Sequence, residues 1–130
     1  MTIANWCVVA ACLLPVLTVG MAKASRARLP RKNGGYDNHN PREWAAKLDG
    51  WQARAVAAQN NGFESLPLFI AAVILAQQAH ATQSTIDSLA ISFIAIRLVY
   101  IFLYLKDYPW MRSVVWFLGI VVCIAMLLIA

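Results

Sequence analysis

Apolar residues gather in four long stretches of the chain, separated by shorter polar segments. The stretches cover residues 3–22, 63–79, 86–105 and 113–130. The first and the last contain no charged residue, and Arg97 interrupts the third near its middle. About 20 consecutive apolar residues in a helix cross the roughly 30 Å hydrocarbon core of a bilayer. The pattern therefore predicts an all-α membrane protein built as a bundle of four transmembrane helices.

The second helix is expected to begin well before its apolar stretch. Residues 40–43, Asn-Pro-Arg-Glu, offer an N-cap, a proline at the first helical position and an acidic first turn. We therefore expect one helix over about 41–80, roughly 60 Å long at 1.5 Å per residue. Its first half would stand outside the hydrocarbon with Trp44 and Trp51 at the interface, and Pro67 would kink it. The other helices are predicted over 3–22, 86–106 and 110–130.

The composition agrees with a single membrane domain over residues 1–130. The chain is 61% hydrophobic and 13% charged, and a soluble protein of this size has too much surface for its volume to bury so many apolar side chains. The first stretch could instead be a cleaved signal peptide. Because no basic residue precedes it and the charges follow it, a retained helix is favoured.

The charges predict an orientation in the membrane. Seven of the eleven Lys and Arg residues lie between Lys23 and Lys47, and short cytoplasmic loops are enriched in these residues. Loops 23–42 and 106–112 are therefore expected in the cytoplasm, and both termini on the other side of the cell inner or plasma membrane. The net charge of +5 comes without a recognition helix or an aromatic-basic platform, which argues against a nucleic-acid partner. The three cysteines match no metal-site spacing.

Polar residues recur at helical spacing inside the predicted spans. Charged groups within a membrane are costly and usually face the bundle interior or a cavity. Brought together, these side chains would form a cationic pocket with one carboxylate, suited to an anionic ligand that carries one ammonium group. The candidates on the second and third helices are Arg54, Asn61, Glu64, Arg97, Tyr100 and Tyr104, and Arg112 with Ser113 opens the fourth helix.

A structural interpretation of the same residues stays open. Glu64 and Arg97 could pair across two helices and satisfy each other. Asn61 could be an interhelical hydrogen-bonding residue of the bundle, and Arg112 could be a cytoplasmic anchor.

Residues 54–69 resemble the second-helix signature of the MAPEG family, the membrane-associated proteins in eicosanoid and glutathione metabolism. In that signature an asparagine precedes a glutamate by three positions, as Asn61 precedes Glu64, and Pro-x-Phe follows. Residues 97–104 are similar to the family's third-helix segment. Residues 109–113 resemble the start of the fourth helix in prostaglandin E synthase relatives.

The resemblance implies a homotrimer with an active site between neighbouring subunits and glutathione as co-substrate. Glu64 would then hold the glutathione amino group, Asn61 its peptide and Tyr104 the bound tripeptide, with Arg54, Arg97 and Tyr100 also in the binding site. Arg112 and Ser113 would lie at the sulfur, where the arginine stabilises the thiolate. The expected activity is that of a glutathione-dependent transferase or peroxidase acting on an apolar electrophile that enters from the lipid.

The chain departs from the family pattern at two places. Ala57 stands where many glutathione-using members have an arginine, and the segment 104–112 is one residue shorter than in the prostaglandin E synthase relatives. These departures support the alternative of a lipid-binding or scaffolding membrane protein that kept the fold and lost the chemistry. Four short helices with two deep charges give little sign of a channel.

Overall fold

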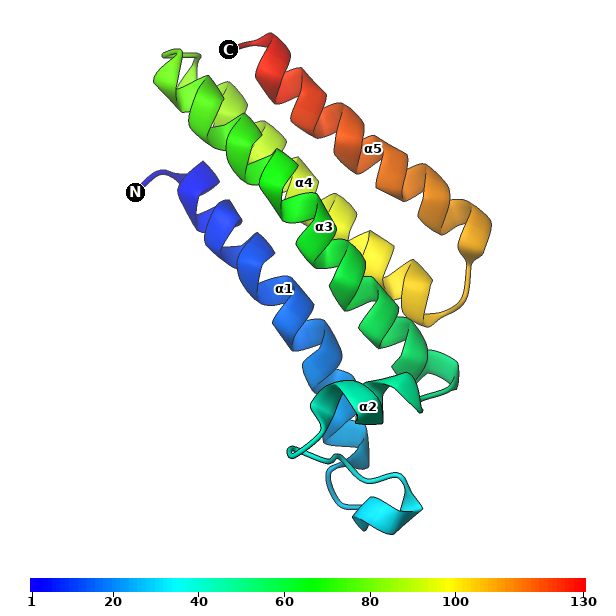
Figure 1. The fold of residues 1–130 in the computed structure, drawn as a ribbon. Helices are drawn as coiled ribbons and strands as arrows, with labels where there is room; N and C mark the ends of the chain where they lie inside the picture. Colours follow the sequence, from blue (N-terminus) through cyan, green and yellow to red (C-terminus); the bar gives the residue numbers. More distant parts are fainter.

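The computed structural model describes residues 1–130, and all its regular elements are helices joined by turns and loops (Figure 1). A short helix and a 3-10 turn lie in the connection after the first main helix. The prediction of an all-α fold with four main helices is confirmed. The main helices are α1 (Ile3–Arg26), α3 (Gly50–Gln78), α4 (Gln83–Leu105) and α5 (Pro109–Leu128); the short elements are η1 (Arg31–Asn33) and α2 (Pro41–Ala46).

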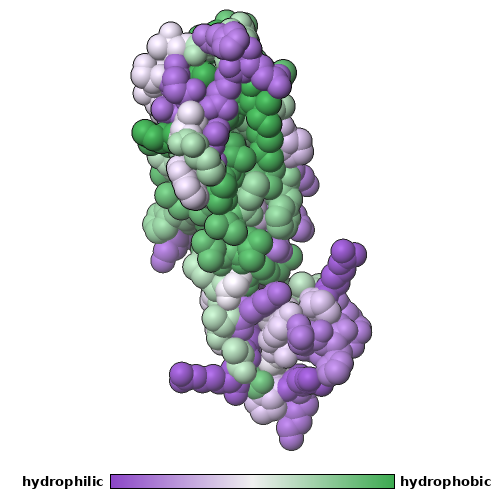
Figure 2. All heavy atoms as spheres, turned by 90° about the vertical axis from the view of Figure 1, so that its left-hand side faces the viewer, coloured by the Kyte–Doolittle hydropathy of each residue, from purple (hydrophilic) through white to green (hydrophobic).

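Three of the main helices are long and apolar enough to cross a membrane: α1, α4 and α5. They contain 24, 23 and 20 residues, and 20 residues at 1.5 Å each span about 30 Å. Large apolar side chains such as Leu17, Phe102 and Phe117 are exposed along them. Figure 2 shows this apolar surface over the helices and the hydrophilic residues gathered beyond one end. The protein is therefore an integral, multi-pass membrane protein.

Helix α3 differs from the other three because polar residues such as Arg54, Asn61 and Glu64 interrupt its apolar sequence. It packs against α1, α4 and α5. Its buried positions are mostly small, which lets neighbouring helix backbones approach closely. Phe69 fills the core beside them and stacks on Phe93 of α4, with ring centroids 3.9 Å apart. The small buried residues of α3 are Ala55, Ala58, Gly62, Ala72 and Ala76.

The expected continuous helix over 41–80 needs correction, because the chain is interrupted at residues 47–49 between α2 and α3. Gly50 has a φ of 55°, a left-handed conformation that ends a right-handed helix and that glycine adopts easily. Trp44 is buried, and its indole Nε1 donates a hydrogen bond to the carbonyl oxygen of Gly34 over 3.2 Å. Residues 27–49 thus fold over the end of the bundle as a polar cap instead of projecting as a rod.

A hydrogen-bonded cluster closes the opposite end, where both termini lie (Figure 1). Asp87 Oδ1 accepts bonds from the backbone N of Ala4 and from Nε2 of Gln83, both over 2.8 Å. Gln77 Nε2 donates to Thr2 Oγ1 over 2.9 Å. A carboxylate is favourable beside the first N–H groups of a helix. This far-end cluster therefore fastens the start of α1 to α3 and α4.

The close crossing of α1 and α3 depends on a glycine. A Cβ added at Gly62 would lie 2.7 Å from Cγ of Pro15, whereas one added at Gly20 would meet nothing within 4 Å. We expect Gly62→Ala to lower the free energy of unfolding by about 1 to 3 kcal/mol, the usual range for overpacking. Gly20→Ala should cause no loss. Thermal unfolding in detergent micelles measures both; equal midpoints would contradict this account of the crossing.

Candidate functional site

Most of the polar residues predicted from the sequence come together where α3, α4 and α5 approach the polar cap. Arg97 Nη1 donates to Oδ1 of Asn61 over 3.0 Å and so joins α4 to α3. The Arg112 guanidinium of α5 lies 4.1 Å from the ring centre of Tyr104 on α4. Three consecutive helices are thus connected through polar and cation–π contacts.

Two arginines and two tyrosines form a continuous row, which we call the arginine–tyrosine row. The Arg97 guanidinium lies 4.3 Å from the ring centre of Tyr100. The Tyr100 and Tyr104 rings meet edge to face with centroids 5.6 Å apart, and Arg112 covers the far ring. Arg97 is 5% exposed, whereas Arg112 is only partly buried. The row therefore runs from the interior of the bundle to its surface and carries positive charge at both ends.

An open hollow of about 460 Å³ lies over the outer part of this row. Its lining combines a cation, an amide and hydroxyls with four aromatic side chains, two of them tyrosines, and it includes no acidic residue. Such a lining can hold an anionic or thiolate group at the cation and an apolar group against the aromatic rings. The lining residues are Asn61, Tyr100, Tyr104, Arg112, Ser113, Trp116 and Phe117.

Glu64 lies beside this hollow with its carboxylate exposed. The ion pair between Glu64 and Arg97, which the sequence left open, is not formed. Instead the Asn61 amide stands between them, since its Oδ1 accepts from Arg97 and its Nδ2 donates to Glu64 Oε2 over 3.5 Å. The carboxylate therefore remains available for a cationic group that the chain itself does not supply.

Arg54 and Ser113 both donate hydrogen bonds to backbone carbonyl oxygens. Both Nε and Nη2 of Arg54 donate to the carbonyl oxygen of Leu105, each over 3.2 Å. Arg54 thereby caps the last turn of α4 and does not line the hollow. Ser113 Oγ donates to the carbonyl oxygen of Pro109 over 3.0 Å, so its hydroxyl faces a ligand as an acceptor.

Trp116 and Phe117 line the hollow, although the sequence pattern predicts them only as part of the apolar stretch 113–130. Trp116 lies four positions after Arg112 and Phe117 lies four positions after Ser113, so each follows a polar lining residue by one helical turn. That spacing was the available signal. Both side chains are also exposed, which places them at the boundary between the hollow and the surrounding lipid.

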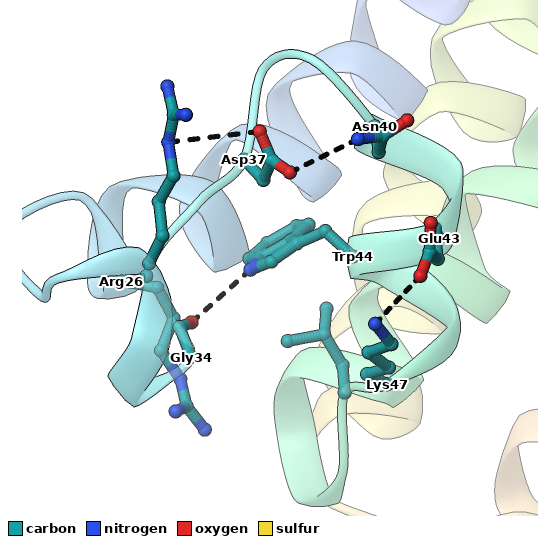
Figure 3. Close-up of a pocket in the computed structure, with 10 residues that line it drawn as sticks. Arg26, Gly34, Asp37, Asn40, Glu43, Trp44 and Lys47 are labelled. Carbon is teal, nitrogen blue, oxygen red and sulfur yellow. Dashed lines mark hydrogen bonds and ion pairs between the residues drawn. The ribbon is translucent and has the colours of Figure 1, made fainter.

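A second hollow, of about 220 Å³, lies within the polar cap (Figure 3). Its acidic residues are already paired with cations: Asp37 Oδ1 lies 3.8 Å from Nε of Arg31, and Glu43 Oε1 lies 2.8 Å from Nζ of Lys47. The backbone N–H of His39 holds the pKa of Asp37 below its usual range, and Glu43 raises the pKa of Lys47. These mutual pairings indicate a role in folding the cap.

A third, open groove of about 610 Å³ runs between α1, α2 and α3 on another side of the molecule. It contains Lys23 and Arg42 as its charged residues, together with the amides Gln59 and Asn60. Its apolar wall includes Phe63, the neighbour of Glu64. In this groove the cations come from α1 and α2 and the amides from α3. The groove lies next to the side of α3 that carries the exposed carboxylate of Glu64.

Comparison with known proteins identifies a family for the chain. A family model described as the MAPEG family matches residues 3–130, which is nearly the whole chain. No curated protein and no solved structure gives a significant match.

The capping contact of Arg54 can be separated from ligand binding. We expect Arg54→Met to lower the free energy of unfolding by about 1 to 3 kcal/mol, because the Leu105 carbonyl loses two charged donors. Lys106→Met is the matched control, since Lys106 follows Leu105 in the chain and its side chain makes no hydrogen bond or ion pair. Chemical denaturation in detergent compares the two, and a control as unstable as Arg54→Met would refute the capping role.

Proposed function

Because this chain belongs to the MAPEG family, we propose that it is a membrane-bound glutathione-dependent transferase or peroxidase. The family is one of membrane enzymes that typically use glutathione and lipophilic substrates. One observation carries the proposal for this chain: Asn61, Tyr100, Tyr104 and Arg112 border one hollow, and beside it lies the Glu64 carboxylate, which pairs with no cation of the chain. This set offers an acceptor for the ammonium group of glutathione, a donor for a peptide carbonyl and a cation for its thiolate.

The proposed roles follow from charge. Glu64 takes the glutathione ammonium, because its carboxylate has no ion-pair partner within the chain. Asn61 offers Nδ2 as a donor to a peptide carbonyl, since its oxygen is already engaged by Arg97. Arg112 stabilises the thiolate, because a guanidinium favours the charged form of a nearby thiol.

The reaction proceeds at the sulfur. In the transferase reaction the thiolate attacks an electrophilic carbon, a C–S bond forms and the leaving group departs with its electron pair. In the peroxidase reaction the thiolate attacks one oxygen of a hydroperoxide, the O–O bond breaks and the alcohol leaves once its oxygen is protonated. The glutathione sulfenic acid that remains then reacts with a second glutathione to give water and glutathione disulfide. Trp116 and Phe117 supply the apolar surface against which the electrophile lies as it arrives from the lipid.

We further propose that the site is completed between subunits of a homotrimer. An uncompensated carboxylate on the surface of a membrane helix is costly, and Glu64 occupies such a position on α3. Exposed apolar residues continue along the same helix beyond it, among them Pro67, Ile74 and Leu75. The groove that carries Lys23 and Arg42 offers complementary charge on a neighbouring copy.

The proposed orientation puts the polar cap in the cytoplasm. Lys and Arg residues are concentrated in the segment from Lys23 to Lys47. The hollow opens at the ends of α4 and α5 that approach this cap. Glutathione is the main soluble thiol of the cytosol, so this orientation gives it direct access to the site.

A non-enzymatic, lipid-binding or scaffolding protein of the same fold is the second candidate. Ala57 supports it, because it replaces a cation on α3 one turn before Asn61. The two candidates differ in one measurable respect: only the enzyme forms a glutathione conjugate.

Turnover of a chlorinated nitrobenzene with glutathione tests the proposal. Purified protein should form the conjugate, and Arg112→Ala should lower kcat by at least about 100-fold, the usual effect of removing one group that stabilises developing charge. Glu64→Gln should raise the KM for glutathione about tenfold or more, since a charged hydrogen bond is lost. Lys106→Ala is the control, a cation near the same end that does not line the hollow.

Binding is measured separately from turnover. Glutathione should raise the thermal midpoint of the wild type in a concentration-dependent way, because a ligand of the native state stabilises it by mass action. No stabilisation by glutathione, no conjugate, and variants that behave as the wild type would together reject the enzyme and leave the second candidate.

A further inference from the structure

Arg97 is the most deeply buried charged residue of the chain, with 5% of its surface exposed. No carboxylate pairs with it. Its only hydrogen bond with another side chain is the one from Nη1 to Asn61 Oδ1, and its Nη2 has no hydrogen-bond partner in the protein. An intramembrane cation so placed marks a functional position.

The space around Arg97 excludes a ligand of the size of glutathione. Arg97 is not among the residues that line the 460 Å³ hollow. It lines two internal cavities of about 10 Å³ each instead, and such a volume holds about one water molecule. Thr18 and Ser65 contribute hydroxyls to the first of these cavities.

We infer that Arg97 is a positioning residue that sets the orientation of the Asn61 amide, in place of the direct contact with glutathione that the sequence predicted. This inference rests on the proposed function and explains why the Asn61 amide of that site has the orientation it has. The two ends of an asparagine amide are nearly equal in size but opposite as hydrogen-bonding groups. With Oδ1 held by Arg97, Nδ2 turns toward Glu64 and the hollow.

The contact with Tyr100 holds the guanidinium in place. The ring covers its face at 4.3 Å and is itself fixed against Tyr104. A planar guanidinium between a ring and an amide oxygen can make both contacts at once, whereas an ammonium group cannot cover the ring in the same way. The Tyr100 ring therefore fixes the direction in which Nη1 of Arg97 donates its hydrogen bond to Asn61.

A double-mutant cycle tests the inference. Arg97→Gln should raise the KM for glutathione about tenfold or more and leave kcat and its pH dependence nearly unchanged, because Arg112 still stabilises the thiolate. In an Asn61→Leu background the same change at Arg97 should have almost no further effect, since its target is gone. Arg97→Lys, which keeps a donor, should recover part of the affinity. Additive effects of the two substitutions would overturn the inference.

A spectroscopic measurement makes the test independent of catalysis. With ¹⁵N-labelled asparagine, the Asn61 side-chain amide should give one sharp pair of proton signals in the wild type. The pair is assigned by its loss in Asn61→Asp. It should shift and broaden in Arg97→Gln and stay sharp in Arg97→Lys. If glutathione does not bind to the wild type, the proposed function fails while the amide signals still decide the role of Arg97. An unchanged Asn61 signal in Arg97→Gln would reject that role.

Discussion

The structure depends on a constraint that the bilayer imposes: a polar group on a membrane helix has no water to satisfy it. This chain concentrates such groups where α3, α4 and α5 meet. Arg54 satisfies the last carbonyl of α4, and Arg97 satisfies the oxygen of Asn61. Helix α3 is consequently the least apolar main helix and also one that packs against all three others. The same contacts that satisfy its polar side chains assemble the candidate site.

The arrangement divides the polar residues into two kinds. Arg54 and Arg97 are engaged by neighbouring helices and set geometry, whereas Glu64 and Arg112 keep exposed groups that can meet a ligand. Charge alone does not distinguish these two kinds of residue, but their depth in the bundle and their hydrogen-bond partners do. Membership of the MAPEG family names a class of reaction. The roles proposed for individual residues rest on the contacts in this chain.

The sequence was sufficient for the four main helices and for most members of the site, because apolar length and a spacing of three or four residues are local properties. It failed where the outcome depended on contacts between distant segments. The break before Gly50 required Trp44 to pack on the backbone of Gly34, and the capping by Arg54 required Leu105 to end α4 beside it. The membrane crossing of α3, the trimer and the orientation stay predictions.

The far-end cluster has a consequence for the order in which the protein is made. The backbone N of Ala4 is bound by Asp87, 83 residues later in the chain. The ribosome completes α1 long before it synthesises α4. The hydrogen bond from the Ala4 backbone N to Asp87 therefore cannot form until the start of α4 has been made. The N-terminus is thus fastened only after the start of α4 has been made, and an extension fused ahead of Thr2 would act on a later step of assembly than its place in the chain suggests.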